Sequence, residues 1–369
     1  MKKKVLHIIT TTGVGGAENM LYKYLCNSDK NQIDHSVISL KTIDILGDKI
    51  KELNIPVNGL SRPIYTLKGM KELYGLVREF DPDILQSWLY HSDLVSLILK
   101  FFLRAKLCWN IRSYKVYKFK RSTGMLVRVL SLFSKVPDVI LINSLASKDY
   151  HHSIWYRPRR WEYIPNGFDP SIFKMRSGIE SDFRDNLNIA SEDCIIGMVS
   201  RYSSDKDHDT FLRACSLINK ERSNTHFVMV GANVDFCNSK LMKLIDELDI
   251  HQNVHLLGIR TDIHLIMPCF DIVCSSSLDE AFPNVIGEAM SAAVPCVVTD
   301  VGDCALLVGD TGKIVQSGSP EHMSAACLDL LKLPKEELND LGVKARDRIM
   351  QEFSIQKISV KYDSIYLGL

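Results

Sequence analysis

Two carboxylates in the second half of the chain stand where they could bind one extended polar ligand. Glu280 and Glu288 lie in DIVCSSSLDEAFPNVIGEAMSAAVPCVVTDVGD, residues 271–303. Its pattern predicts a buried strand, a turn, a helix beginning near Pro283 and a second buried strand. The turn places Glu280 at the mouth of the expected site and Glu288 about two turns deeper. This arrangement suits two sets of hydroxyl groups, although a loop acid and a helix-surface acid would show the same spacing.

Two cations follow the first predicted strand of the same half of the chain. Arg201 comes directly after the strand IIGMVS, and Lys206 lies in the loop before the next helix, with no obvious acidic partner on the strand. A guanidinium and an ammonium group that converge at a strand end can bind a diphosphate and stabilise it as a leaving group. The backbone amides of Phe282, Asn284 and Val285 could meet the same phosphates. Each cation taken alone is more often a surface charge.

A glycine-rich turn near the N-terminus could also hold a ligand. The stretch TTTGVGGAENML, residues 10–21, follows the apolar run Val5–Ile9 and opens a predicted helix. Gly13 and Gly15 fit the dinucleotide-binding pattern G-x-G-x-x-G/A. Glu18 stands where that pattern needs a small residue, which argues against a nicotinamide or flavin site. We predict a turn that approaches phosphate or sugar hydroxyls, with helix packing alone as the alternative.

Short apolar runs alternate with helix-length amphipathic stretches, which is typical of parallel sheets with crossover helices. The first half contains the strand candidates VLHII, HSVISL, IPVNGL, DILQSW, LCWNIR, VILINS and EYIPNG, and the second contains IIGMVS, HFVMVG, VHLLG, DIVCSSS, PCVVTD and KIVQS. We predict a first domain over residues 1–170, a linker with a short helix over 171–192 and a second domain over 193–352. A final helix over 353–369 would pack back on the first domain.

Composition excludes several other classes of protein. A chain of 369 residues with 46% hydrophobic and 24% charged residues is typical of a two-domain globular protein, and its net charge of +1 says nothing about nucleic acid. Ten cysteines are scattered without a C-x-x-C pair, which favours a reducing, cytoplasmic location and argues against a structural metal site. The most apolar later stretch, residues 94–103, is too short to cross a bilayer.

One region of the first half is strongly basic, because no acidic residue occurs between Asp93 and Asp138. Its cations are Lys100, Arg104, Lys106, Arg112, Lys115, Lys118, Lys120, Arg121, Arg128 and Lys135. Within it, residues 124–135 have the amphipathic pattern of a helix that could lie in a membrane interface. We predict contact with an anionic membrane surface rather than with nucleic acid. A core helix with a solvated basic face is the alternative.

Several blocks of the sequence resemble glycosyltransferase family 4, whose members are retaining enzymes with the GT-B fold. Glu280 and Glu288 match the E-x7-E motif of that family. The other matching blocks, in the family's usual order, are GVGGAE, QSWLYHSD, WNIRS, IPNGFD and SRYSSDKDHDTFLRA, and with the segment EAFPNVIGEAMSAAVPCVVTDVGD they span nearly the whole chain. The resemblance implies an α/β fold with two facing Rossmann-like, doubly wound domains around a central cleft.

By this resemblance, the second domain would bind the donor, a UDP- or GDP-sugar. Glu288 would hold the ribose hydroxyls, and Glu280 would meet the transferred sugar. Arg201 and Lys206 would bind the diphosphate and stabilise it as it leaves. The remaining donor-binding residues expected in this domain are Phe282, Pro283, Asn284, Val285, Gly231 and Arg260.

The first domain would contribute Gly15 and Gly16, near the diphosphate and the acceptor, and His91, near the transferred sugar. His91 thereby joins Glu280, Arg201 and Lys206 as a catalytic candidate, with a satisfied loop histidine as the alternative. In the family, retention without a side-chain nucleophile is attributed to front-side attack, in which positioning and charge stabilisation do the work. We expect no metal and no other cofactor, because the cations and helix N-termini can neutralise the phosphates.

The predicted function is therefore a retaining transfer of a hexosyl or N-acetylhexosaminyl group from a nucleoside-diphosphate sugar. The acceptor would be a hydroxyl group of a lipid-linked glycan in surface polysaccharide synthesis, such as O-antigen or capsule. The protein would act in the cytoplasm, at the inner face of the cytoplasmic membrane. A sugar-nucleotide epimerase or phosphorylase of the same fold, and a non-catalytic sugar-nucleotide-binding protein, are the alternatives.

Overall fold

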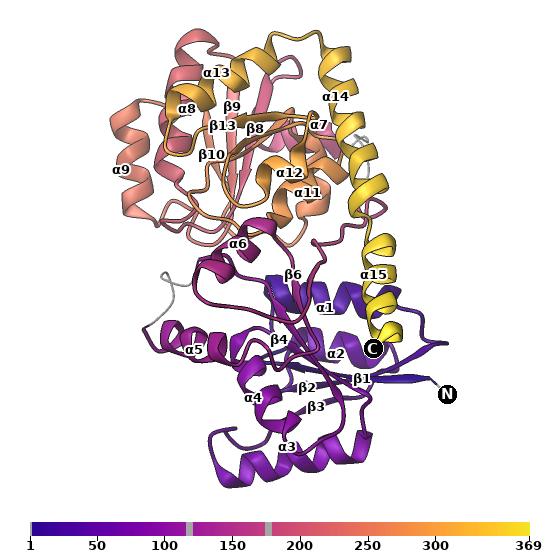
Figure 1. The fold of residues 1–369 in the computed structure, drawn as a ribbon. Coiled ribbons are helices and arrows are strands. Elements are labelled where there is room, and N and C mark those ends of the chain that lie inside the picture. Colours follow the sequence, from indigo (N-terminus) through magenta and orange to yellow (C-terminus); the bar gives the residue numbers. More distant parts are fainter. Residues whose placement is uncertain (1, 116–120, 174–178) are drawn as a thin grey trace. The chain divides into compact units, whose positions relative to one another are not determined.

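The computed structural model describes residues 2–115, 121–173 and 179–369, and the chain divides into two compact units. The first unit contains Met1–Gly167 and Ile355–Leu369, and the second contains Phe168–Ser354. Each unit is built on one parallel sheet with helices on both of its faces (Figure 1).

The sheet of the first unit has the strand order β3-β2-β1-β4-β5-β6-β7. Its strands are β1 (Lys3–Ile9), β2 (Ile33–Ser39), β3 (Val57–Gly59), β4 (Ile84–Trp88), β5 (Lys106–Ile111), β6 (Val139–Ile142) and β7 (Trp161–Tyr163). Its helices are α1 (Gly16–Asn27), α2 (Ile45–Glu52), α3 (Leu67–Phe80), α4 (Tyr90–Lys100), α5 (Arg121–Leu132), α6 (Leu145–Ser153) and α15 (Ile355–Gly368). Successive residues of β1 enter different cores: Val5 packs with residues of α1 and α15, whereas Leu6 packs with residues of α3, α4 and α5.

The sheet of the second unit has the order β10-β9-β8-β11-β12-β13. Its strands are β8 (Cys194–Val199), β9 (Thr225–Val230), β10 (Val254–Leu256), β11 (Ile272–Ser275), β12 (Cys296–Thr299) and β13 (Lys313–Val315). Its helices are α7 (Ile179–Asn186), α8 (His208–Glu221), α9 (Ser239–Leu248), α10 (Ile263–Ile266), α11 (Asn284–Ser291), α12 (Cys304–Val308), α13 (Pro320–Leu331) and α14 (Lys335–Arg348), with the short turns η2 (Met267–Cys269) and η3 (Ile349–Phe353). Ile195 and Ile196 of β8 again enter different cores, which contain α11 and α8 respectively.

The α/β fold class predicted from the sequence is confirmed. Each strand candidate overlaps one of the strands β1 to β13. The strands could be predicted from the sequence because strands of parallel sheets are buried on both faces and therefore consist of continuous apolar runs. Within the ranges that the structure describes, no helix is both long and apolar enough to cross a bilayer.

The chain passes between the units after Gly167 and after Ser354, close to the boundaries expected at 170 and 353. The described part of the stretch expected to be a linker, 171–192, belongs to the second unit instead. The reason lies in Arg184 of α7, whose buried guanidinium donates to the backbone oxygens of Ala190 and Asp193 and lies 3.6 Å from the carboxylate of Asp271. Apolar residues of the same stretch add to this anchor, because Phe173 and Ile189 are buried in the core of the second unit and Phe183 and Leu187 pack against it.

The turn between β4 and α4 holds a strained residue and a buried acid. Leu89 has φ 70° and ψ 160°, a backbone conformation that residues other than glycine rarely adopt. Four residues on, the Asp93 amide donates to the Leu89 carbonyl, and one carboxylate oxygen of Asp93 accepts from the Ser87 hydroxyl at 2.6 Å. The other carboxylate oxygen is buried and meets no donor in the described residues. Burial raises the pKa of Asp93 well above its usual value, which favours the neutral carboxyl group in the folded chain.

We predict that Asp93→Asn flattens the dependence of stability on pH. The folded state holds a proton on Asp93 to higher pH than the unfolded chain does, so the free energy of unfolding falls as pH rises above about 4. An amide has no proton to lose, so the variant should be at least as stable as the natural chain at pH 7. All four tryptophans, Trp88, Trp109, Trp155 and Trp161, lie in the first unit, so urea unfolding followed by their fluorescence reports on this unit.

The matched control for this series is Asp34→Asn, because Asp34 is exposed on β2. Its substitution should leave the slope of stability against pH unchanged. An Asp93→Asn variant that keeps the natural slope, or that loses stability at pH 7, would contradict the assignment of a neutral, buried carboxyl group.

Candidate functional site

The second unit concentrates polar side chains at the carboxyl ends of β8 and β11. These strands are neighbours, yet α8, which follows β8, and α11, which follows β11, cover opposite faces of the sheet. Such a switch point leaves a crevice at the strand ends, where doubly wound proteins bind their ligands. The loops after β8 and β11 contain the predicted residues Arg201, Lys206 and Glu280.

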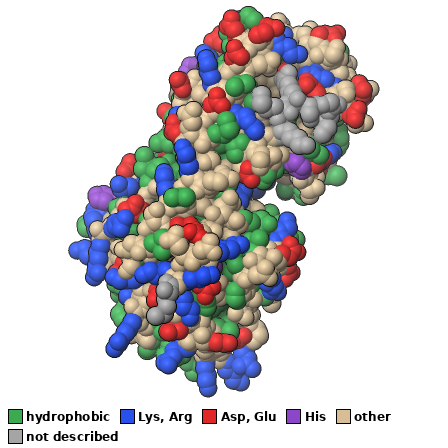
Figure 2. Space-filling view, turned by 90° about the vertical axis from the view of Figure 1, so that its right-hand side faces the viewer, with side chains coloured by type: hydrophobic (Ala, Val, Ile, Leu, Met, Phe, Trp, Pro, Cys, Tyr) green, Lys and Arg blue, Asp and Glu red, His purple; other side chains and the backbone are tan. Residues whose placement is uncertain are grey.

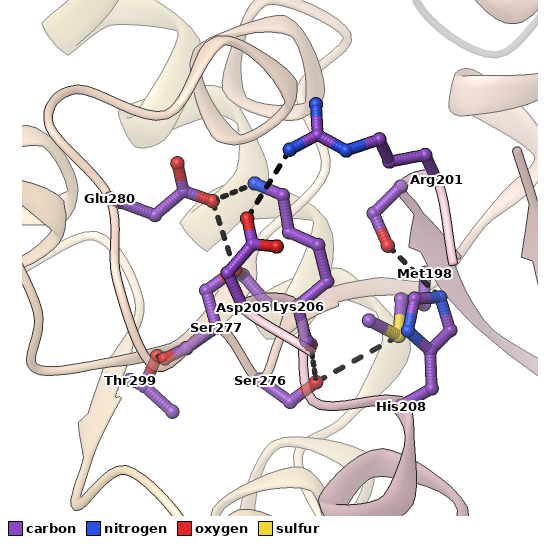
Figure 3. Close-up of polar contacts among 11 residues, drawn as sticks. Met198, Arg201, Asp205, Lys206, His208, Ser276, Ser277, Glu280 and Thr299 are labelled. Atoms are coloured by element: carbon purple, nitrogen blue, oxygen red, sulfur yellow. Dashed lines mark hydrogen bonds and ion pairs between the residues drawn. The ribbon is translucent and has the colours of Figure 1, made fainter. Parts of the chain in front are cut away.

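Lys206 and Glu280 form an ion pair within this crevice (Figure 3). Both side chains are largely buried, with 19% and 15% of their surfaces exposed. The same carboxylate oxygen of Glu280 accepts from the Ser277 hydroxyl at 2.9 Å. The Ser276 hydroxyl holds the Lys206 loop in place, because it lies within donating distance of two backbone oxygens of that loop. They are the carbonyl oxygens of Lys206, at 2.8 Å, and Asp207, at 2.9 Å.

Arg201 occupies the outer part of the same region. Its side chain is 66% exposed, and its guanidinium lies 3.5 Å from the carboxylate of Asp205. Burial alone would raise the pKa of Asp205, but hydrogen bonding and the positive charges of Lys206 and Arg201 outweigh burial and lower it. No acidic partner lies on the strand itself, as expected, but both cations have acidic partners in loops. Asp205, the partner of Arg201, lies four residues away on the same loop. Glu280, the partner of Lys206, lies in the loop after β11.

The E-x7-E segment adopts the predicted order of turn and helix. Pro283 precedes α11, which begins at Asn284, and Glu288 lies in the second turn of that helix with its side chain partly exposed. Phe282 is buried, and its ring packs against those of Phe168 and Phe353. Because the Phe282 side chain is buried, this residue could contact a ligand only through its backbone, which is the role predicted for its amide.

Gly302 supports the Glu280 turn and was not among the predicted site residues. Its φ is +56°, and a Cβ atom there would lie 2.0 Å from the carbonyl oxygen of Glu280. The loop after β12 can therefore press against the Glu280 backbone only with glycine at this position. Thr299, which was also not among the predicted site residues, donates a hydrogen bond to the Ser277 carbonyl at 2.6 Å. The sequence signal for both was the short stretch TDVGD, which follows a predicted strand.

Gly231 and Arg260, the residues expected near a nucleobase, lie in neighbouring loops. The Gly231 amide donates to the Gly258 carbonyl at 2.8 Å, so this N–H is already used within the protein. A Cβ atom on Gly231 would lie 2.0 Å from the Ser200 carbonyl oxygen, which explains the need for glycine. Arg260 is exposed and forms a bidentate pair with Asp262, with distances of 2.8 and 2.5 Å. Its charge is thus balanced on the surface.

His208 is a further polar residue at this switch point. Its Nε2 lies 3.2 Å from the Ser200 hydroxyl, and burial lowers the pKa of His208 to about 4. The ring is therefore neutral at physiological pH and adds no charge to the two cations. Its position in the polar stretch DKDHD, two residues after Lys206, placed it near the predicted site, but the sequence did not indicate that it would be buried.

The predicted residues of the first unit lie at the equivalent switch point of its own sheet. Gly15 is the residue before α1, which follows β1, and His91 is exposed in the first turn of α4, which follows β4. The Glu18 carboxylate folds back onto the start of α1, because a Cβ atom on Gly15 would meet it at 2.4 Å. Gly16 is the first residue of that helix. A carboxylate here opposes a second anion and suits a ligand with hydroxyl groups.

Comparisons with known proteins agree with this geometry. Residues 14–172 match the family described as Glycosyltransferase Family 4, and residues 193–333 match Glycosyl transferases group 1. The chain is 23% identical to an Escherichia coli UDP-Gal:alpha-D-GlcNAc-diphosphoundecaprenol alpha-1,3-galactosyltransferase, over 100% of this chain and 97% of the relative. It is 27% identical to the N-acetyl-alpha-D-glucosaminyl L-malate synthase of Bacillus anthracis, but over only 55% of this chain and 52% of that relative.

A solved structure shows the same fold over the full length. The Anabaena protein HepE, in complex with UDP and glucose, superposes with a TM-score of 0.85 and 20% sequence identity over 100% of both chains. The two family matches together cover the strands β2 to β13 and the loops that contain Gly15, Arg201, Lys206 and Glu280. The chain belongs to glycosyltransferase family 4 and has the GT-B fold.

Proposed function

We propose that this glycosyltransferase moves a sugar, with retention of configuration, from a nucleoside-diphosphate sugar to a hydroxyl group of a lipid-linked glycan. The observation that carries the proposal is the Lys206–Glu280 pair at the switch point of the second sheet, within the E-x7-E segment. Lys206 and Arg201 can neutralise a diphosphate, and Glu280 can accept hydrogen bonds from sugar hydroxyls. Glu288, farther along α11, would hold the ribose.

The ion pair gives donor binding a specific form. Lys206 already has a counter-ion in Glu280, so an arriving diphosphate must share or replace that carboxylate. The exchange would release Glu280 toward the sugar at the moment when Lys206 turns to phosphate. Leaving-group charge would then be stabilised by Lys206, Arg201 and the start of α11, and we propose that no metal is needed.

A uridine nucleotide and a diphosphate-linked glycan are the first substrates to test. HepE was solved with UDP and glucose, and the E. coli relative is named for UDP-Gal and for an acceptor carried on diphosphoundecaprenol. Those names describe the other two proteins. They support for this chain a hexosyl or N-acetylhexosaminyl donor and an acceptor of bacterial surface polysaccharide synthesis.

We also propose that α4 and α5 dock on an anionic membrane, where such an acceptor would reside. Val127 and Leu130 of α5 face the core, whereas Met125, Val129 and Leu132 are exposed. The helical spacing places Arg121 and Arg128, both exposed, on the same outer stripe. The exposed residues Ile98, Phe101 and Phe102 continue this surface at the end of α4, which packs against α5.

The stripe presents large apolar side chains to solvent, since Met125 and Leu132 are 69% and 78% exposed. On the face of the molecule drawn in Figure 2, hydrophobic side chains appear in small groups between charged and polar ones. Not every cation of the basic region contributes, because Lys100 and Lys106 lie 3.9 and 3.1 Å from Asp138. Lys118 and Lys120 lie outside the described residues. A peripheral position at the inner face of the cytoplasmic membrane follows from this proposal.

The central test is transfer by site variants. Lys206→Ala should lower transfer at least about 100-fold, since removal of one group that stabilises developing charge has effects of this size. Glu288→Gln should lower transfer by weakening donor binding, because its carboxylate would hold the ribose hydroxyls. Glu288→Gln removes no core volume and should keep the melting temperature. Lys206→Ala leaves the largely buried Glu280 without its counter-ion and should lower the melting temperature, so its transfer is measured where the variant is still folded. Lys220→Ala and Glu336→Gln, both exposed in the same unit, are the matched controls. NMR of the product would report retention, and near-normal turnover in either site variant would remove its assigned role.

Donor binding can be measured separately by thermal shift with UDP, GDP, ADP, CMP and dTDP sugars. A ligand at a hundredfold excess over its Kd stabilises the folded state by about 2.7 kcal/mol. We expect one nucleotide class to shift the melting temperature equally with and without EDTA, and Glu288→Gln to lose that shift. A shift that EDTA removes would contradict the metal-free site, and donor consumption without any acceptor would favour an epimerase or phosphorylase.

Membrane docking predicts a third result. Co-sedimentation with vesicles of anionic phosphatidylglycerol should exceed that with neutral phosphatidylcholine. Arg128→Glu should weaken binding several-fold, because each well-placed cation contributes about 1 kcal/mol at an anionic surface. Leu132→Ser should weaken it without changing charge, whereas Lys220→Glu in the second unit should leave it unchanged. Equal binding of all variants would show that α5 does not face the lipid.

A further inference from the structure

Arg112, the residue that directly follows β5, carries a guanidinium group without a counter-ion. It forms no ion pair with any residue in the described parts of the chain, and its hydrogen bonds go to neutral oxygens. One of them reaches the Tyr362 hydroxyl at 3.1 Å, and the other reaches the side-chain oxygen of Asn166. The guanidinium also lies over the ring of Trp88, 5.6 Å from its centre.

The two neutral anchors are themselves fixed in place. The Tyr362 hydroxyl also accepts from the Asn110 amide at 3.1 Å, and the Asn166 oxygen also accepts from the Asn143 amide at 3.3 Å. Each oxygen has two lone pairs, so both anchors are fully used as acceptors. They orient the guanidinium fork without bringing any negative charge to it.

Other buried cations of this chain are treated differently. Arg184, whose side chain is 7% exposed, has Glu180 and Asp271 beside it, and Lys206 has Glu280. Arg346 forms no ion pair with a carboxylate among the residues that the structure describes, but it donates to three backbone oxygens, one of which is that of Ser291 at the negative end of α11. Arg112 uses two of its five N–H groups on neutral side chains, so most of its donors and its whole charge remain for something else.

The position of Arg112 indicates what that partner would be. β5 lies next to β4 in the sheet, so Arg112 lies at the same carboxyl edge as His91 and the Gly15 turn. Ligands of doubly wound sheets bind at that edge. A guanidinium fork matches paired anionic oxygens, such as those of a phosphate or a carboxylate. The cations proposed for the donor diphosphate, Arg201 and Lys206, belong to the second unit, so Arg112 is available for an anion of the acceptor.

We propose that Arg112 binds the anionic diphosphate that joins the glycan acceptor to its lipid. The inference rests on the proposed function and names a residue for the part of the acceptor that is charged. Because Arg112 meets that group away from the reacting hydroxyl, it governs how tightly the acceptor binds. A carboxylate of an acidic sugar would satisfy the same fork, and the choice of acceptors below separates the two sources.

The first test measures binding by calorimetry with the full-length protein saturated with UDP, so that the donor's diphosphate site is filled. The probe is geranyl diphosphate. Arg112→Gln should weaken its binding at least 10-fold, Arg112→Lys should give an intermediate loss because the fork is gone and the charge is kept, and UDP binding should not change. Arg78→Gln, exposed on α3, is the matched control. Equal binding by the natural protein and Arg112→Gln, or no binding by either, would overturn the proposal.

The second test separates recognition from structure through kinetics. With a diphosphate-linked acceptor, Arg112→Gln should raise the acceptor KM at least 10-fold while kcat and the donor KM stay within about twofold. With a neutral alkyl glycoside of the same sugar, the variant should match the natural protein. An equal loss with both acceptors would show a structural role, and a loss confined to acceptors with an acidic sugar would assign the fork to a carboxylate; either outcome overturns the proposal. If the natural protein transfers sugar to no acceptor while probe binding still depends on Arg112, the proposed function fails and the anion site stands.

Discussion

All strands of both sheets run parallel, and this constraint decides where the molecule can do chemistry. A parallel sheet has both faces covered by crossover helices, so polar side chains are pushed to the loops at the strand ends. The pairs β8 with β11 and β1 with β4 are the points where successive helices pass to opposite faces. Lys206 and Glu280 lie at the first of these points, and the Gly15 turn and His91 lie at the second.

The second unit arranges its charges in balanced pairs before any ligand arrives. Lys206 with Glu280 and Arg201 with Asp205 leave little uncompensated charge at the strand ends. A largely buried ammonium without a partner would be costly, so the Glu280 carboxylate stabilises Lys206 in the folded chain. In the proposed function, donor binding would be an exchange of counter-ions, which favours a ligand that supplies both phosphate for the cation and hydroxyls for the released acid.

In the first unit, the buried polar groups next to Trp88 are neutral and form hydrogen bonds instead of ion pairs. Trp88 can only donate, so its bond of 3.2 Å makes Nδ1 of His7 an acceptor, and Nε2 of His7 then donates to His35 at 3.1 Å. Burial lowers the pKa of His35 to about 3, and the ring lies 2.9 Å from the Ser28 hydroxyl. A rigid, uncharged interior of this kind lies behind Trp88, the ring on which the Arg112 guanidinium rests.

The sequence by itself determined the elements, because strand burial and helix amphipathicity are written in the spacing of neighbouring residues. It located β8, β11 and α11, and it placed Glu280 before the helix and Glu288 within it. Only the tertiary structure decided which side chains meet across long separations: Lys206 with Glu280, Arg112 with Tyr362, and Arg184 with Asp271. Such contacts depend on how loops of different strands fold over one edge of a sheet, and no local period records that. The same limit explains why the partner of Lys206 was not visible in the sequence, and why only the structure showed Arg112 without an ion pair among the described residues.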